Sequence, residues 1–233
     1  MHYIKLVYRS LLFLTAVTLY IISRVQNTGE LFRGFENKYW LLGIVWLVYA
    51  VEMVLRFFPS RLESMGCQKQ FKKNYIPVKQ AKLKRQSWKR TFAVSAAWVL
   101  LNGIIGVLYY TKCIDAGILI LISLAYGVCD MICILFFCPF QTWFMKNRCC
   151  TTCRIYNWDF AMMFTPLIFI PDWYTYSLLG CALVLLARWE ISYRMYPERF
   201  SETTNQCLDC ARCKEKLCRH KKQLQGFLKK HKA

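Results

Sequence analysis

The sequence predicts an all-α integral membrane protein with about six membrane-crossing helices. Hydrophobic residues make up 56% of the chain and charged residues only 19%, whereas soluble domains carry about 45–50% and about 25%. The apolar residues are concentrated in blocks close to the 20 or so residues that cross a bilayer. The net charge of +19 falls almost entirely between or after these blocks, as charges that orient a membrane protein do.

Four blocks are clear, and a fifth begins the chain. The clear blocks span residues 40–58, 92–110, 116–137 and 174–193. The first block, 4–23, contains Lys5 and Arg9, whose long side chains we expect to reach the lipid headgroups. It could also be the apolar region of a signal peptide. Because residues 21–23 form a poor cleavage site, we favour a retained signal anchor.

The sixth segment, 155–170, is short and contains polar residues and a proline. We favour a kinked membrane crossing over a re-entrant hairpin. Asp159 lies near its start and is expected to cap the helix and to pair with Arg148 or Arg154.

Six crossings place both termini on the same side. Only four basic residues then lie on the other side, and the remaining 28 of the 32 share the side of the termini. The positive-inside rule makes that side cytoplasmic. The sequence therefore predicts a cell-membrane domain over 1–200, with a basic cytoplasmic loop at 56–91 and a cysteine-rich cytoplasmic tail at 201–233.

Thirteen cysteines suggest a metal site on the cytoplasmic side, where thiols stay reduced. Two Cys-x-x-Cys pairs let one tight turn aim two sulfurs at a common ion, as in zinc sites. The candidate ligands are Cys150, Cys153, Cys207, Cys210, Cys213, Cys218 and His220. The two pairs could share one zinc ion, or the tail could form a local site of its own. Cys129, Cys133 and Cys181 lie inside segments and are expected to pack as small apolar residues.

Other cofactors fit the sequence less well. An iron–sulfur cluster is disfavoured because the last spacing of the tail cysteines is four residues and Cys218 is followed by arginine instead of proline. We expect no membrane-embedded haem with paired histidine ligands, because no histidine lies inside a segment. A tail without metal, free or palmitoylated, is the remaining alternative.

Polar residues inside the segments are the candidates for an ion or substrate path. Asp130 has no basic neighbour one helical turn away, and we expect Asn102 to lie at a comparable depth. Glu52 precedes Arg56 by four residues, which predicts a pair within one helix. A structural hydrogen bond between helices has similar sequence requirements.

No P-loop, nucleophile elbow, zinc-protease helix or dinucleotide fingerprint occurs. In general appearance the chain resembles small bacterial membrane proteins with cysteine-rich cytoplasmic tails, a likeness that implies no activity. The leading hypothesis is a non-enzymatic membrane protein whose zinc site has a structural, docking or sensing role toward a cytoplasmic protein partner. The alternatives are a small transporter or channel for a cation or small solute, using Asp130, Glu52 and Asn102, and an iron–sulfur redox protein. The basic segments suit anionic lipid headgroups better than nucleic acid.

Overall fold

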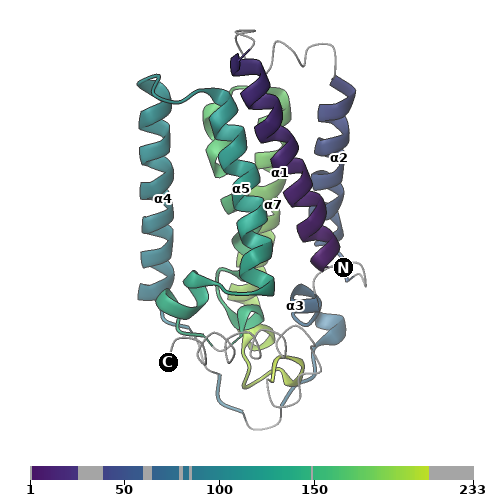
Figure 1. The fold of residues 1–233 in the computed structure, drawn as a ribbon. Coiled ribbons are helices and arrows are strands. Elements are labelled where there is room, and N and C mark those ends of the chain that lie inside the picture. Colours follow the sequence, from purple (N-terminus) through teal and green to yellow (C-terminus); the bar gives the residue numbers. More distant parts are fainter. Residues whose placement is uncertain are drawn as a thin grey trace, which may run out of the picture.

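The protein is described by a computed structural model over residues 2–25, 39–59, 65–78, 81–83, 86–147 and 149–209. Within these ranges it is helical and contains no strand, which confirms the predicted all-α class. The long helices are α1 (His2–Val25), α2 (Tyr39–Leu55), α4 (Trp88–Tyr110), α5 (Ala116–Leu135) and α7 (Trp173–Met195). They stand side by side in an elongated bundle (Figure 1).

The first four long helices alternate in direction along the bundle, and α7 runs in the same direction as α5 (Figure 1). One end, the lower end in Figure 1, carries the start of α1 and α4 and the ends of α2, α5 and α7. The short helix α3 (Met65–Gln68) and the irregular segments 136–158 and 196–209 gather there. We call this the loop end. It corresponds to the side that the sequence predicts to be cytoplasmic.

Three of the helices, α1, α4 and α5, are long and apolar enough to cross a membrane. Within the part of α2 whose side chains the structure describes, the apolar stretch covers Gly43–Leu55. The helices α2 and α5 stop two or three residues before their predicted ends. Pro59 and Pro139 follow these ends, and a residue before proline is disfavoured in helical geometry. These lengths are compatible with a membrane protein.

The segment predicted at 155–170 is not one continuous helix. It consists of η5 (Tyr156–Trp158), α6 (Asp159–Phe164) and η6 (Thr165–Phe169), two 3₁₀ helices around a short α-helix. Asp159 pairs with Arg56 just beyond α2, at the loop end. The ring of Phe169 contacts that of Tyr110 at the opposite end, with centroids 6.0 Å apart. The segment therefore runs along the bundle from one end to the other.

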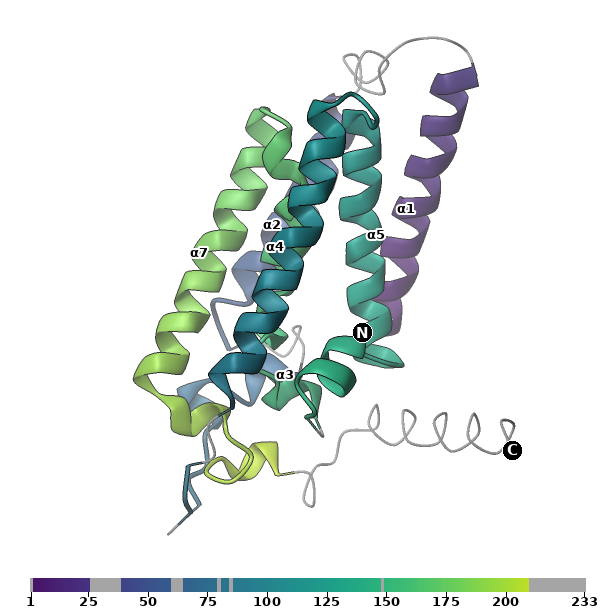
Figure 2. The ribbon, with the colours of Figure 1, turned by 90° about the vertical axis from the view of Figure 1, so that its left-hand side faces the viewer.

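Helix α5 lies at the centre of the packing, beside α1 in both views (Figures 1 and 2). Two of its glycines allow close approach. A Cβ on Gly117 would lie 2.8 Å from the ring of Tyr20, and one on Gly127 would lie 2.8 Å from the sulfur of Met163. Small residues at helix contacts let backbones approach closely, which is the main way that helices associate in lipid.

The loop end is held together by the segment that follows α7. Asn205 is fully buried, and its Nδ2 donates to the carbonyls of Lys69 (2.9 Å) and Arg199 (2.8 Å). The backbone N–H of Val78 donates to Thr204 at 3.1 Å. The first residues of the predicted tail are therefore fixed against the loop that contains α3.

Gly106 provides a test of how η6 contacts α4. A Cβ there would overlap the ring of Phe169, whereas one on Gly103, one turn earlier, would meet nothing within 4 Å. We expect Gly106→Ala to lower the midpoint temperature of unfolding in detergent. Gly103→Ala should leave it unchanged or raise it, because alanine is favoured over glycine by about 1 kcal/mol in a helix. Equal shifts for the two variants would contradict the packing of Phe169 on α4.

Candidate functional site

The interior of the bundle contains a buried arginine held by two acidic residues. Arg9 of α1 is 2% exposed. Its Nη2 donates to Glu52 Oε2 of α2 at 2.8 Å, and its Nη1 lies 3.3 Å from Asp130 Oδ2 of α5. The same Nη1 donates to the carbonyl of Gly127 at 3.1 Å. One guanidinium therefore ties three helices together.

Further charges extend this contact into a balanced cluster. Glu52 also lies 3.3 Å from Lys5 Nζ. Arg56 and Asp159 form a second buried pair at 2.5 Å, with the guanidinium 4.7 Å from the ring centroid of Phe160. We call this the charge cluster; its members are Lys5, Arg9, Arg56, Glu52, Asp130 and Asp159. Three cations face three carboxylates, so the cluster is neutral as a whole.

Several sequence-based expectations about these residues were wrong. Arg9 does not reach a headgroup region but is buried. Glu52 binds two cations of α1, and Arg56 binds Asp159, so both link different elements. Arg154, an expected partner of Asp159, pairs with Glu190 instead, and Arg148 lies outside the described residues. The sequence analysis missed the contact between Arg9 and Asp130. The available signal was an arginine inside one apolar segment and an aspartate without a nearby basic residue inside another.

A cavity of about 380 Å³ lies next to the charge cluster, between α4, α5, α6 and the π-helical turn η3 (Phe140–Phe144). Seven of its 18 lining residues contain sulfur. They are Cys129, Cys133, Cys138, Cys150, Cys153, Met162 and Met163. Cysteine and methionine number only 13 and 8 in the 233 residues, so sulfur is strongly enriched here. We call this cavity the sulfur pocket.

The remaining lining is mainly aromatic and aliphatic, with Asp130, Asp159 and Gln141 as its polar members. Cys133 and Cys138 both line the pocket, and their thiols are close enough to interact. Cys150 Sγ donates to Gln141 Oε1 at 2.7 Å. None of the described cysteines forms a disulfide.

Cys153 is buried, and it closes the turn formed by η4 (Cys150–Thr152). Its backbone N–H donates to the carbonyl of Cys150 at 2.9 Å. Burial raises the pKa of the Cys153 thiol to about 12, because a thiolate loses solvation in apolar surroundings. The thiol is therefore protonated at neutral pH, and binding a metal would require it to lose that proton.

The predicted metal ligands are only partly brought together. Cys150 and Cys153 line the sulfur pocket, whereas Cys207 lies in the segment after α7 and donates from Sγ to the carbonyl of Asn74 at 3.1 Å. Cys210, Cys213, Cys218 and His220 lie outside the described residues. Among the residues that are described, no three His, Cys, Asp or Glu side chains form a group that could hold a metal ion.

The predicted path residues do not converge either. Asp130 lines the sulfur pocket, but Glu52 and Asn102 are not among its described lining residues. Asn102 donates from Nδ2 to the carbonyl of Trp98 at 3.0 Å, while its buried Oδ1 has no hydrogen-bond partner in the described part of the chain. What Asp130 and Glu52 share is Arg9.

No family model, curated protein or solved structure matches this chain. Function is therefore inferred from the chemistry of the charge cluster and the sulfur pocket. In the cluster every carboxylate already faces a cation. In the pocket the thiols and thioethers are soft, polarisable groups that bind soft metal ions.

Removing Arg9 should leave Asp130 without its ion-pair partner and Glu52 with Lys5 alone. We expect Arg9→Met to destabilise the protein by about 3–5 kcal/mol, measured by reversible unfolding in mixed micelles. The matched control is Arg24→Met on the same helix, whose pair with Asp115 is 62% and 42% exposed; it should change stability little. Adding Glu52→Gln to Arg9→Met should recover part of the loss. An Arg9 variant no weaker than the Arg24 variant would contradict a structural role for the cluster.

The raised pKa of Cys153 predicts slow alkylation in the metal-free protein. At pH 8 we expect iodoacetamide to modify Cys153 at least about tenfold more slowly than the exposed Cys113, because the thiolate is the nucleophile. The rate at Cys153 should continue to rise as the pH approaches 12. Mass spectrometry of peptides after timed quenching gives both rates. If restricted access alone slowed the alkylation of Cys153, the rate would be low but would not keep rising toward pH 12.

Proposed function

We propose that the chain is a multi-pass membrane protein that binds a thiophilic metal ion in the sulfur pocket, at its cytoplasmic end. Six membrane crossings, with both termini inside, are supported by the alternating directions of α1, α2, α4 and α5 and by the return of α7 to the loop end. They are also supported by the run of η5, α6 and η6 from one end of the bundle to the other. The buried contacts of Arg9 support a first helix that is retained and not cleaved.

The observation that carries the metal proposal is the sulfur lining of one cavity by two residue types. Thiolates and thioethers together favour soft ions such as Cu(I), whereas hard ions such as Mg²⁺ prefer oxygen ligands and keep bound water. The aromatic and aliphatic walls of the pocket offer such water few partners. A soft, easily dehydrated ion therefore fits this cavity best.

Charge balance further restricts which metal ion the pocket can accept. Asp130 and Asp159 already face Arg9 and Arg56, so a bound cation must be neutralised by thiols that lose protons. A monovalent ion that replaces one thiol proton gives a neutral complex, which an apolar cavity accepts at least cost. Cu(I) needs as few as two sulfur ligands. Cys133 and Cys138, which both line the pocket and are close enough to interact, offer such a pair.

Zinc in a site completed by the tail is the second candidate. The loop that fixes Asn205 also reaches the Cys150–Cys153 turn, since Gln70 Nε2 donates to the carbonyl of Thr151 at 2.7 Å. The tail thus begins at the same end as that turn. A zinc ion shared by the two Cys-x-x-Cys pairs would tie tail to turn and form a docking or sensing surface for a cytoplasmic protein. An iron–sulfur cluster on the tail cysteines stays a prediction.

The geometry favours binding over conduction. A cation that used both Asp130 and Glu52 would have to displace Arg9, which holds both. Transport of a cation or small solute stays an alternative that requires this rearrangement. Anionic lipid around the basic loop and tail is compatible with either function.

The deciding experiment measures metal binding by the full chain, purified in detergent under reducing, oxygen-free conditions without chelator. We expect one Cu(I) per chain in competition with a chromophoric Cu(I) chelator. The double variant Cys133→Ser/Cys138→Ser should lose this binding. The control Cys113→Ser/Cys181→Ser changes two exposed thiols outside the pocket and should retain it.

A third variant, Cys210→Ser/Cys213→Ser, separates the two candidates. Stoichiometric zinc that disappears with the tail cysteines, together with Cu(I) affinity that is equal in all variants, would replace the copper proposal by the zinc one. Absence of binding of either metal to folded protein would overturn both.

A further inference from the structure

A second cavity, of about 520 Å³, opens at the loop end and shares no lining residue with the sulfur pocket. It lies between the start of α4, the loop that follows η3, and the segment after α7, which includes η7 (Pro197–Phe200). Neither the charge cluster nor the predicted cysteine ligands contribute to it. Its chemistry is therefore independent of the proposed function.

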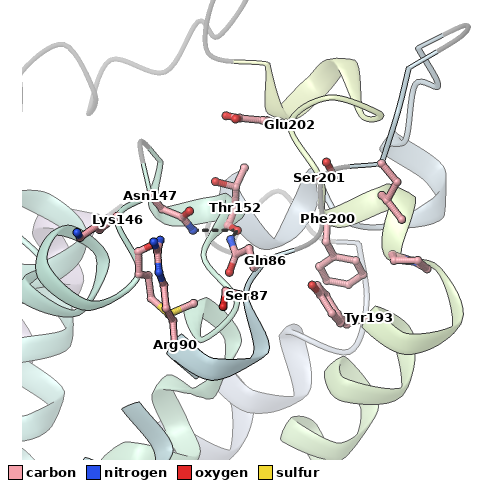
Figure 3. Close-up of a pocket in the computed structure, with 13 residues that line it drawn as sticks. Gln86, Ser87, Arg90, Lys146, Asn147, Thr152, Tyr193, Phe200, Ser201 and Glu202 are labelled. Atoms are coloured by element: carbon pink, nitrogen blue, oxygen red, sulfur yellow. Dashed lines mark hydrogen bonds between the residues drawn. The ribbon is translucent and has the colours of Figure 1, made fainter. Parts of the chain in front are cut away.

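The two sides of this cavity differ in character (Figure 3). Gln86, Ser87, Arg90 and Asn147 lie on one side, and Tyr193 and Phe200 lie on the other. An occupant would therefore meet hydrogen-bond donors and positive charge on one side and aromatic rings on the other.

Local contacts hold the polar side in place. Arg90 Nη1 donates to the carbonyl of Met145 at 3.1 Å, which fixes the guanidinium beside the loop after η3. Gln86 accepts from the backbone N–H of Arg154 at 2.8 Å and donates to the carbonyl of Thr152. Ser87 precedes α4 and makes no capping hydrogen bond with its side chain. Backbone groups therefore hold Arg90 and Gln86 in place, while the Ser87 side chain makes no capping bond.

The charges that line the cavity sum to a positive value. Arg90 and Lys146 are its cations, and Glu202 is the only acidic residue in its described lining. A guanidinium binds phosphate oxygens through two parallel hydrogen bonds, and a lysine adds a point charge. The volume suits a small molecule, whose apolar part would lie against the aromatic side.

We infer that this cavity binds a phosphate group carried either by a small soluble ester or by a phospholipid headgroup. Arg90 and Lys146 contact the phosphate, and Ser87 is placed to donate a hydrogen bond to it. Glu202 opposes an anion and limits its affinity. Neutralising Glu202 should therefore strengthen phosphate binding, an increase that a purely structural role of this residue would not produce.

The test uses the full chain purified in a non-ionic detergent. Glycerol 3-phosphate and inorganic phosphate are the soluble probes, titrated by calorimetry. Phosphatidylglycerol and phosphatidylcholine, added in micelles and counted by native mass spectrometry, are the lipid probes. Binding of glycerol 3-phosphate without lipid indicates a soluble ester, and retention of phosphatidylglycerol alone indicates a lipid headgroup.

Three variants and one control decide the site. We expect Arg90→Gln to weaken binding about tenfold, as loss of a charge-assisted pair does, and Lys146→Gln to weaken it less. Glu202→Gln should strengthen binding. Lys89→Gln, an exposed neighbour that does not line the cavity, should leave it unchanged.

Arg90→Gln also loses the contact with Met145, so a folding defect in that variant is anticipated. The opposite effects of Lys146→Gln and Glu202→Gln then decide the matter, since damage to the fold would weaken binding in both. No binding of any phosphate probe, or equal affinity in all four variants, would overturn the inference.

Discussion

The architecture depends on one buried arginine. Arg9 lies in the bundle interior, where an unpaired charge would cost several kcal/mol. It is compensated only because α2 and α5 each bring a carboxylate to it. The position of α1 on α5, and the depth at which α2 enters the bundle, are therefore constrained together. Apolar packing in lipid supplies no comparable constraint on register, because lipid tails are as apolar as the side chains.

The same interaction shapes the sulfur pocket. Asp130 and Asp159 belong to both the charge cluster and the pocket lining, and each is committed to an arginine. The other reactive groups in the pocket lining are its thiols and thioethers. Under the proposed function, this cavity would select a metal ion by softness and not by charge, because the ion would exchange for a thiol proton instead of displacing an arginine.

The helices were readable from the sequence because their signal is local. The apolar runs of α4 and α5 predicted crossing segments. Pro166 in the segment 155–170 predicted that this segment is not a straight helix. The contacts of Arg9 were not readable, because Asp130 lies 121 residues further along the chain. Arg9 was assigned to the headgroups by a rule for single helices, which takes no account of partners on other helices.

The sulfur pocket was missed for a different reason. Cys129 and Cys133 were expected to pack as apolar residues, which their sequence surroundings favour. Four residues apart on one helix, they share a face with each other, and Cys138 follows just beyond the helix end. That spacing was a usable signal. The approach of the Cys150–Cys153 turn to this face depends on the course of 136–158, which has no regular period.

The position of Arg9 also sets an order for biogenesis. Arg9 is synthesised before either of its carboxylate partners, and the last of them, Asp130, follows 121 residues later. Until α5 has been made, Arg9 lacks the carboxylate of Asp130 that helps to compensate its burial. The contacts of the first helix are therefore completed only after more than half of the chain has been synthesised.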